Sequence, residues 1–215
     1  MKACILANGN IKNKNKLARI ISRSDLIICA DGGARHLKKI RVLPHVIIGD
    51  FDSLTPEDKA YFEKNNIRTI KHPADKDATD TELAAIWAFK HKACDITFTG
   101  VSGTRLDHTL ANIFLLKKMA DLKIKCRIID DYNEIYLVTD KITLKRDKNS
   151  FVSIIPLTKQ AEGVSTSGLK YPLNNAKIDF GTSRGISNKF SDEKATIFVK
   201  KGILIVTKSR DCLED

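Results

Sequence analysis

The stretch LIICADGGARHLKKI, residues 26–40, combines a short apolar run, a turn and a helical pattern. Five apolar residues at 26–30 are typical of a buried strand, and Asp-Gly-Gly at 31–33 is an ordinary turn sequence. Similar apolar runs occur at 4–7, 46–48, 67–70, 96–99 and 124–129, and helical patterns alternate with them at 14–22, 34–40, 55–65, 79–91 and 108–122. This alternation predicts an α/β fold, with a parallel sheet covered by helices on both faces.

The pattern changes after Asp130. Apolar runs at 135–139, 142–144, 151–156, 195–199 and 203–207 are separated by turn-rich segments that show no helical periodicity. Such spacing predicts a small antiparallel β-domain, and Lys201-Gly202 is expected to form a hairpin turn between the last two runs. We therefore expect an α/β domain at 1–130 and a smaller all-β domain at 131–215.

The composition excludes several classes of protein. The 215 residues are 42% apolar and 29% charged, as in ordinary globular proteins. No apolar run approaches the roughly 18 to 20 residues of a membrane helix, and the first run ends at Asn8-Gly9, too early for a secretory signal. The five cysteines form no C-x-x-C pair. Buried free thiols in a reducing compartment explain them, so we expect a cytoplasmic protein without a membrane partner.

The net charge of +11 raises the possibility of a nucleic-acid partner. The basic residues are dispersed and lack interleaved aromatic residues. A solvated lysine-rich surface explains this pattern, and a field that attracts anionic nucleotides is a second interpretation. We therefore expect no nucleic-acid partner.

Polar residues follow four of the expected strands, at the edge of the sheet where parallel α/β proteins bind ligands. They are Asp31-Gly32-Gly33, Gly49–Ser53, Asp75–Asp80 and Gly100–His108. A stable sheet does not require so many aspartates at one edge. The sequence therefore predicts a ligand site there.

Asp50 and Asp52 are candidate metal ligands. Alternation along an extended segment places both carboxylates on one side, where they repel unless a cation lies between them. Mg²⁺ prefers such hard oxygen ligands, with water and substrate phosphates completing its shell. Asp80 is expected in the first turn of the next helix, after Thr79, and completes the set. Because helix N-termini favour acids, some of the carboxylates at 75, 77, 80 and 82 could instead serve the helix.

Other groups at this edge suit phosphate. Gly32 and Gly33 would let phosphates approach the backbone amides of the next helix, although the same residues could form only a tight turn. The planar guanidinium of Arg105 can bind two phosphate oxygens. Asp107 either caps the following helix or holds Arg105, and His108 is either a catalytic base or a capping or packing residue. The sequence has neither a G-x-x-x-x-G-K-[ST] loop nor a G-x-G-x-x-G fingerprint.

Several motifs together resemble those of the thiamine pyrophosphokinases. In the first part they are ADGGA (30–34), GDFDS (49–53), DKDATDTELA (75–84) and GTRLDHTLAN (103–112), and the second part adds VSTSGLKYPL (164–173) and FGTSRGISN (180–188). The resemblance spans most of the chain. It is most specific in GDFDS followed by D-x-D-x-T-D.

The resemblance implies an N-terminal α/β domain that holds ATP and metal, a C-terminal β-sandwich, and a homodimer with active sites at the subunit interface. Thiamine and ATP are the implied partners, and Mg²⁺ is the implied cofactor. The implied metal ligands are Asp50, Asp52 and Asp80. The implied ATP-site residues are Asp31, Gly32, Gly33, Asp77, Thr79, Ser102, Arg105, Asp107 and Asn112. Asp80 would also contact thiamine, with Tyr171, Ser187 and Asn188 of the partner subunit.

The resemblance also implies the reaction. The hydroxyl group of thiamine would attack the β-phosphorus of ATP, and AMP would leave. Asp50, Asp52, Asp80 and Arg105 would serve catalysis by holding the metal and neutralising phosphate charge. Asp80 could also accept the hydroxyl proton. Animal members have tryptophan where Tyr171 stands in this chain.

Two other functions fit parts of the sequence. A phosphatase of the haloacid dehalogenase type also carries D-x-D after a strand, but its motif continues D-x-D-x-[TV], whereas Leu54 occupies the last position here. A regulator that binds nucleotide without catalysis is the second alternative. Consumption of ATP distinguishes them, because only the kinase makes AMP in the presence of thiamine.

Overall fold

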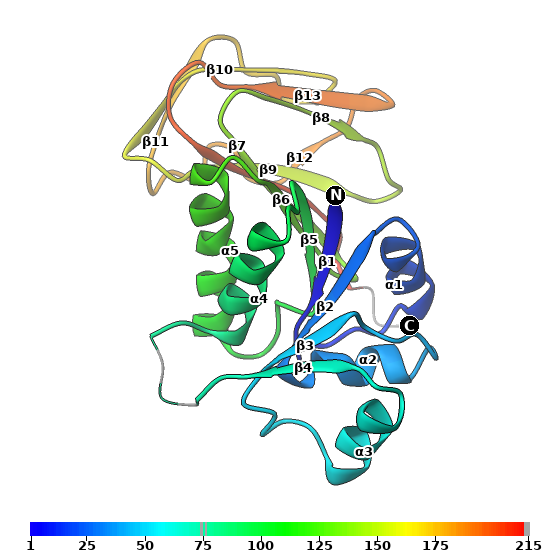
Figure 1. Cartoon of the computed structure of the whole chain (residues 1–215). Helices are drawn as coiled ribbons and strands as arrows, with labels where there is room; N and C mark the ends of the chain where they lie inside the picture. Colours follow the sequence, from blue (N-terminus) through cyan, green and yellow to red (C-terminus); the bar gives the residue numbers. More distant parts are fainter. Residues whose placement is uncertain (74, 76, 213–215) are drawn as a thin grey trace. The chain divides into compact units, whose positions relative to one another are not determined.

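The computed structural model describes residues 1–73, 75 and 77–212. Its contacts divide the chain into two compact units, Met1–Asp131 and a second unit that begins at Tyr132. This division lies one residue beyond the boundary expected from the sequence. The two units are described separately below (Figure 1).

The first unit contains a parallel sheet of six strands in the order β6-β5-β1-β2-β3-β4. The strands are β1 (Lys2–Leu6), β2 (Leu26–Ala30), β3 (Val46–Gly49), β4 (Arg68–Lys71), β5 (Asp95–Thr99) and β6 (Lys125–Ile129). The chain moves outward from β1 to β4 and then returns to the other side of β1 for β5 and β6. The carboxyl ends of β1 and β5 therefore meet at the switch point, where α/β sheets bind ligands.

Helices cover both faces of this sheet (Figure 1). One face carries α1 (Lys14–Ile21), η1 (Asp31–Gly33), α2 (Ala34–Lys38) and α3 (Pro56–Lys64). Leu17, Leu37 and Phe62 of these helices form one core with Cys4 and Cys29 of the sheet. On the other face, α4 (Asp80–Lys90) contacts β1, β2 and β3, and α5 (Leu106–Asp121) contacts β6. The α/β class and the covered parallel sheet expected from the sequence are confirmed.

Side-chain caps fix the starts of two helices at the carboxyl edge. The Thr55 hydroxyl accepts a hydrogen bond from the Asp58 amide at 3.1 Å, and Pro56 follows as the first helical residue. The Thr79 hydroxyl accepts from the Glu82 amide at 3.2 Å. The helix expected from residue 55 therefore begins at Pro56, with Thr55 as its N-cap. These caps settle where the loops after β3 and β4 end.

The second unit contains two antiparallel sheets, β12-β9-β14-β7 and β11-β10-β13-β8. The strands are β7 (Asn133–Val138), β8 (Lys141–Lys145), β9 (Phe151–Pro156), β10 (Gln160–Ser167), β11 (Ala176–Asp179), β12 (Asn188–Lys189), β13 (Lys194–Phe198) and β14 (Leu204–Ser209). Val152 and Val206 of the first sheet share one buried core with Val164 and Ile197 of the second. The expected antiparallel sandwich is confirmed.

The predicted hairpin at Lys201-Gly202 is wrong. β13 pairs with β8 and β10, whereas β14 pairs with β7 and β9, so the turn carries the chain from one sheet to the other. Gly202 has φ +99°, and a Cβ there would lie 2.6 Å from the Gln160 carbonyl oxygen. Glycine at this position therefore lets the chain pass close to the Gln160 backbone as it crosses from one sheet to the other.

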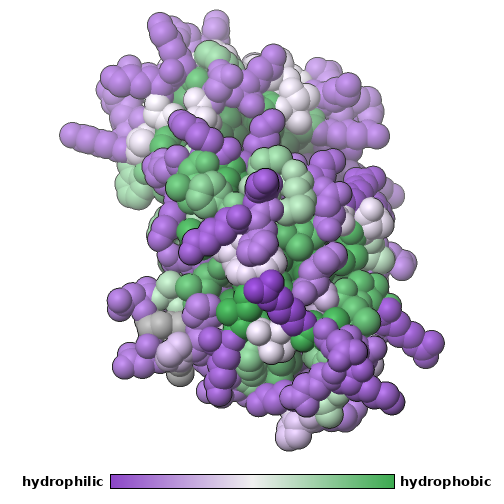
Figure 2. All heavy atoms as spheres, viewed as in Figure 1, coloured by the Kyte–Doolittle hydropathy of each residue, from purple (hydrophilic) through white to green (hydrophobic). Residues whose placement is uncertain are grey.

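The hydrophilic side chains are spread across the whole face of the molecule shown in Figure 2. On this face they do not gather into one patch. Among the described residues, none of the helices has the length and apolar character that a membrane span needs.

Candidate active site

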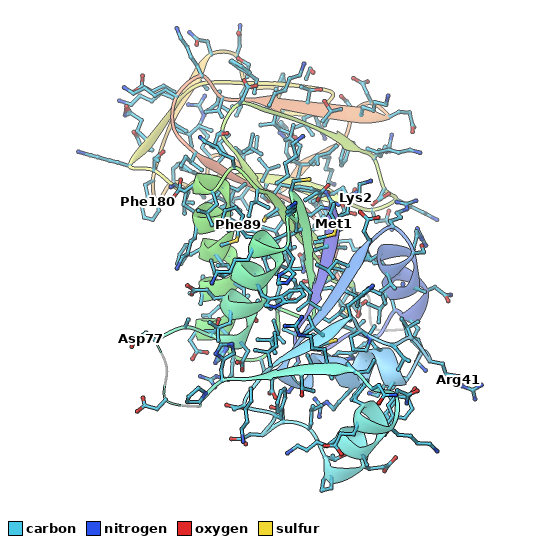
Figure 3. All side chains as sticks on the ribbon, viewed as in Figure 1. Met1, Lys2, Arg41, Asp77, Phe89 and Phe180 are labelled. Atoms are coloured by element: carbon cyan, nitrogen blue, oxygen red, sulfur yellow. The ribbon has the colours of Figure 1, made fainter. Side chains whose placement is uncertain are left out.

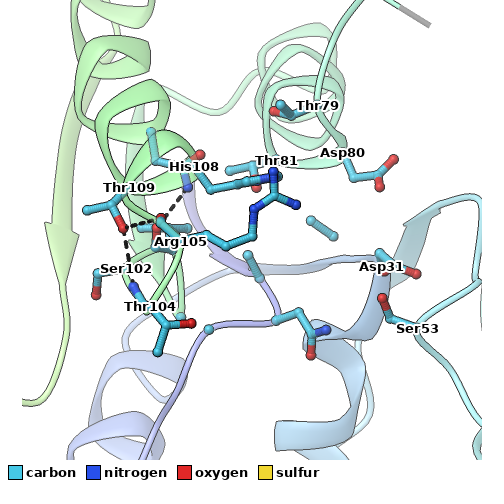
Figure 4. Close-up of a pocket in the computed structure, with 18 residues that line it drawn as sticks. Asp31, Ser53, Thr79, Asp80, Thr81, Ser102, Thr104, Arg105, His108 and Thr109 are labelled. Atoms are coloured by element: carbon cyan, nitrogen blue, oxygen red, sulfur yellow. Dashed lines mark hydrogen bonds between the residues drawn. The ribbon is translucent and has the colours of Figure 1, made fainter. Parts of the chain in front are cut away.

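A cavity of about 450 Å³ lies at the carboxyl ends of the strands in the first unit (Figure 4). The loops after β1, β2, β3 and β5 and the first turns of α4 and α5 line it. The lining residues are Ala7, Asn8, Gly9, Ala30, Asp31, Ser53, Thr79–Thr81, Gly100–Arg105, His108, Thr109 and Asn112. The ligand site predicted at this edge of the sheet therefore has a cavity that can accept a small molecule.

Three carboxylates converge beside this cavity. Asp31, Asp50 and Asp80 each offer an oxygen atom, and the three atoms lie within 4.8 Å of one another. They come from the ends of β2 and β3 and from the first residue of α4. A Cβ at Gly49 would lie 3.1 Å from Asp31 Cβ and 3.2 Å from Asp80 Cγ. Glycine at 49 therefore leaves room for the three acids to converge.

This group has the chemistry of a divalent-cation site. Asp31 Oδ1 is buried and receives no hydrogen bond from any described residue. A buried carboxylate oxygen without a donor is costly, and three neighbouring carboxylates repel one another. A hard cation such as Mg²⁺ would offset both costs, because it binds carboxylate oxygens. The residues present therefore fit a bound divalent metal.

Of the three predicted metal ligands, the structure brings two together. Asp50 and Asp80 lie in the three-carboxylate group, whereas Asp52 is exposed and lies outside that group among the described residues. The Asp52 amide donates to Asp50 Oδ1 at 3.1 Å. Asp31, which the resemblance assigned to the nucleotide, takes the third place in the group.

The other acids between residues 75 and 82 are not among the described residues that line the cavity. Asp75 and Asp77 are exposed, and neither belongs to the described lining (Figure 3 labels Asp77 on the loop that joins β4 to α4). Glu82 forms an ion pair with Lys118. Among the described residues of this segment, Asp80 is the acid that lies with Asp31 and Asp50 in the three-carboxylate group. The predicted role of Asp77 at the ATP site stays a prediction.

Arg105 lines the cavity and is held by Asp107. Arg105 Nε donates to Asp107 Oδ1 at 3.2 Å, and Nη2 donates to Oδ2 at 2.6 Å. Asp107 lies within the first turn of α5, after the N-cap position, which is Arg105 itself. Of the two interpretations of Asp107, holding Arg105 is therefore the one that the geometry supports. The hydrogen bonds from Arg105, followed by that from the His108 amide, lower the pKa of Asp107 to about 2.

The Arg105 guanidinium remains accessible despite this ion pair. The side chains of Arg105 and Asp107 are 69% and 63% exposed. His108, one residue later, is also exposed and lines the same cavity. Figure 4 shows Arg105 extending across the cavity, between the loop after β5 and the start of α4. A cation in this position can bind an anionic ligand while Asp107 restricts its rotamers.

Two predicted ATP-site residues shape the loop after β5. Ser102 Oγ donates to Asp130 Oδ2 at 2.7 Å. Asn112 is buried, and its Nδ2 donates to the Val101 carbonyl oxygen at 2.8 Å. Both residues line the cavity. Asn112 thus bonds the backbone of this loop, and Ser102 links the loop to the Asp130 side chain.

Close packing against the end of β1 requires glycine at positions 32 and 33. A Cβ at Gly33 would lie 2.2 Å from the Leu6 carbonyl oxygen, and a Cβ at Gly32 would lie 2.7 Å from Asn8 Cγ. Both glycines are buried and lie outside the described lining of the cavity. Their predicted approach to phosphate stays a prediction.

The sequence reasoning missed the loop after β1. Asn8 and Gly9 line the cavity. Arg35 donates a hydrogen bond to Asn8 Oδ1, and His36 Nε2 lies 2.8 Å from the Gly9 carbonyl oxygen. The other loops were identified because polar residues directly follow a strand. Asn8-Gly9 directly follows β1 in the same way, so this signal could have identified the loop.

Three of the four predicted thiamine residues lie in the second unit. Tyr171 is 59% exposed, and Ser187 is exposed with φ +59°. Asn188 is buried, and its side-chain amide bonds the backbone of Tyr171. The structure thus brings Tyr171 and Asn188 together and places Ser187 beside Asn188 in the chain.

Comparison with known families assigns both parts of the chain. Residues 17–128 match the family "Thiamin pyrophosphokinase, catalytic domain", and residues 139–204 match "Thiamin pyrophosphokinase, vitamin B1 binding domain". The chain is 34% identical to the thiamine pyrophosphokinase of Bacillus subtilis (strain 168), over 98% of this chain and all of that protein.

Solved structures give the same result. The crystal structure of the Bacillus subtilis thiamine pyrophosphokinase has a TM-score of 0.88 and 31% identity, over 99% of this chain and 100% of that one. The structure of thiamin pyrophosphokinase from Geobacillus thermodenitrificans has a TM-score of 0.85 and 30% identity, with the same coverage. The similarity therefore extends through both units and the segments that line the cavity.

Proposed function

The chain belongs to the thiamin pyrophosphokinase family, and we propose that it transfers the diphosphate group of ATP to the hydroxyl group of thiamine. Thiamine diphosphate and AMP are the products. Family membership makes the chain an ATP:thiamine diphosphotransferase. It does not support a phosphatase of the haloacid dehalogenase type or a non-catalytic regulator.

The observation that carries the mechanism is the group formed by Asp31, Asp50 and Asp80 beside the cavity. Mg²⁺ bound there would polarise the phosphoryl oxygens of ATP and neutralise part of their charge. Asp50 and Asp80 would hold the ion together with Asp31, whose buried Oδ1 has no described donor. Asp52 stays a proposed fourth ligand on the resemblance alone.

The protein groups around this site would align the reactants. Arg105, oriented by its two hydrogen bonds to Asp107, would bind phosphate oxygens and stabilise charge as AMP leaves. Asp80 at the start of α4 would accept the proton of the attacking hydroxyl. The proposed ATP site adds Gly32, Gly33, Thr79, Ser102 and Asn112, with Asp77 supported by the resemblance alone.

The thiamine side would be formed by Tyr171, Ser187 and Asn188, with Asp80. An exposed aromatic ring such as that of Tyr171 can stack on the cationic thiazolium of thiamine. The vitamin B1 binding domain family covers residues 139–204, which include all three residues of the second unit.

We also propose a homodimer whose active sites lie at the subunit interface. Each unit exposes large apolar side chains, and exposed apolar patches often mark protein–protein interaction sites. Leu106, Leu110 and Phe114 follow one another at helical spacing on α5 and are 67%, 42% and 53% exposed. In the second unit, Phe180 (labelled in Figure 3) and Ile186 are 65% and 47% exposed.

We propose a cytoplasmic location. All five cysteines are free thiols, and burial raises the pKa of Cys4 to about 12. Cys94 and Cys212 are exposed, unlike the buried thiols expected from the sequence, and unpaired thiols of both kinds suit a reducing compartment.

Incubation with ATP, Mg²⁺ and thiamine, followed by chromatography of the products, tests the proposed activity. We expect equal amounts of AMP and thiamine diphosphate, and neither product when EDTA replaces Mg²⁺. Free phosphate formed without thiamine would indicate a phosphatase, and unchanged ATP would indicate a binding protein.

A further inference from the structure

The turn between β3 and α3 contains a bulky residue with an unusual backbone conformation. Phe51, directly after Asp50, has φ +67°. This left-handed region is rare for aromatic residues, because their Cβ approaches the neighbouring backbone. Such a conformation persists only where the surrounding structure imposes it, and it is concentrated at functional sites.

The core beneath the turn supplies that constraint. The side chain of Phe51 is half-buried and packs against the core cluster that α1, α2 and α3 form with the sheet. Leu54 belongs to the same cluster and is 5% exposed. The Leu54 amide also donates to the Phe51 carbonyl oxygen at 3.3 Å. The turn is therefore attached to the core at two apolar side chains.

The polar residues of the same turn serve the site. Asp50 belongs to the three-carboxylate group, and Ser53 lines the cavity. The Asp52 amide donates to Asp50 Oδ1 at 3.1 Å. Because this amide follows Phe51 in the chain, the backbone conformation of Phe51 sets the direction of its N–H bond. The left-handed turn therefore orients the Asp50 carboxylate as well as its backbone.

We propose that Phe51 is a positioning residue for the metal. The ring, packed on the core, holds the turn that brings the Asp50 carboxylate to Asp31 and Asp80. This role rests on the proposed function, because it takes the three carboxylates as the metal site. A residue with only a core role would affect the stability of the fold and leave the metal affinity unchanged. Loss of the Phe51 ring should also weaken metal binding in protein that is still folded.

Binding of Mn²⁺ without nucleotide tests this role, with free Mn²⁺ measured by electron paramagnetic resonance. Phe51→Ala should weaken Mn²⁺ binding about 10-fold, the lower end of the range for residues that orient metal ligands. Phe51→Leu keeps an apolar anchor and should weaken Mn²⁺ binding less than Phe51→Ala does. Circular dichroism and thermal unfolding of each variant report the fold.

Phe62→Ala is the matched control, because Phe62 is 1% exposed in the same cluster and is not among the three carboxylates or the cavity lining. It should lower Tm and leave the Mn²⁺ affinity unchanged. If either alanine variant fails to fold, Phe51→Leu and Phe62→Leu provide the same comparison. Wild-type affinity in the folded Phe51 variants, or equal weakening by the Phe62 variants, would overturn the role. Absence of Mn²⁺ binding in the wild-type protein would instead overturn the metal site itself, and the role with it.

Discussion

The side-chain amide of Asn188 holds the backbone of Tyr171 through two hydrogen bonds. Asn188 Oδ1 accepts from the Tyr171 amide at 3.0 Å, and Nδ2 donates to the Tyr171 carbonyl oxygen at 2.7 Å. Asn188 is buried, whereas the Tyr171 side chain is 59% exposed. The amide of Asn188 is therefore engaged with the protein, and its contribution to thiamine binding would come through the position of Tyr171.

Asn188→Ala should raise KM for thiamine and leave KM for ATP unchanged, because the substitution releases the backbone that carries Tyr171. Both backbone groups of Tyr171 would lose their partner, so the free energy of unfolding should fall by about 1 to 3 kcal/mol. Steady-state kinetics and denaturant unfolding measure the two effects.

Ser187→Ala is the control for stability, since Ser187 is exposed. It should change the free energy of unfolding by less than about 0.5 kcal/mol. Unchanged thiamine kinetics in a folded Asn188→Ala protein would remove this pair from the thiamine site.

Asp31→Asn should lower activity and preserve or raise stability in metal-free buffer. The amide removes one of three neighbouring negative charges, so the repulsion between Asp31, Asp50 and Asp80 decreases. The same change removes a proposed metal ligand, and we expect kcat to fall about 100-fold or more. Thermal unfolding in EDTA and steady-state kinetics at saturating Mg²⁺ test the two effects.

Asp50→Asn and Asp80→Asn should lose activity to the same degree. Asp52→Asn provides the comparison, because Asp52 lies outside the three-carboxylate group. An Asp31→Asn variant with more than half of the wild-type kcat would exclude Asp31 from the metal site. Loss of activity in Asp52→Asn would support its proposed place as a fourth ligand.

The fold was largely predictable because its apolar runs are local signals. The strands at 26–30 and 151–156 have the bounds expected from the sequence. β10 was missed because Ala161 and Val164 are its buried apolar residues, and Gly163, with φ +68°, interrupts it. The short strands β11 and β12 likewise lack a continuous apolar run. Lys201-Gly202 looked like a hairpin because sequence does not reveal which sheet a strand will join.

The site was predictable to the level of its loops but not of its contacts. The rule that ligands bind at strand ends identified the loops that carry Asp31, Asp50, Asp80 and Arg105. The association of Asp31 with Asp50 and Asp80 depends on the pairing of β2 with β3 and on the start of α4. The role of Asn188 depends on a contact 17 residues away in the chain, which no local pattern encodes.

Arg105→Lys should lower kcat/KM for ATP about 10- to 100-fold, because lysine keeps the charge but loses the planar group that binds two oxygens. Initial rates at varied ATP and saturating thiamine give this ratio. The titration of Asp107 provides a second readout, since the Arg105 hydrogen bonds are the largest cause of the lowering of its pKa from 3.8 to about 2.

The sign of the pH effect follows from that direction. When folding lowers the pKa of a carboxyl, the ionised carboxyl stabilises the folded protein at any pH above the pKa that it has in the unfolded chain. This contribution is lost as the pH falls from about 4 to about 2. We therefore expect no change in the contribution of this pair between pH 5 and 9. In Arg105→Gln, the pKa of the Asp107 carboxyl followed by NMR should rise from about 2 toward 3.8, with the His108 amide hydrogen bond still lowering it. A midpoint that stays near 2 would show that Arg105 does not control Asp107.

Mixing Asp50→Asn with Asn188→Ala tests the proposed assembly, in an assay with thiamine well below the raised KM of Asn188→Ala, so that neither variant alone is active. Asp50→Asn changes the first unit and Asn188→Ala changes the second, so an interface site would combine residues from two chains. Each mixed dimer would then carry one site with both defects and one site with neither. Random pairing makes about half of the dimers mixed, so about a quarter of the wild-type activity should return. No recovery despite demonstrated subunit exchange would place each site within one chain.

Transfer of label from ATP that carries ³²P at the β-phosphorus tests the central claim most directly. If the chain transfers a diphosphate group, the label should move into thiamine diphosphate with one AMP formed for each product molecule, and Asp50→Asn should abolish the transfer. Label that remains in ADP, or that appears as free phosphate without thiamine, would contradict the account.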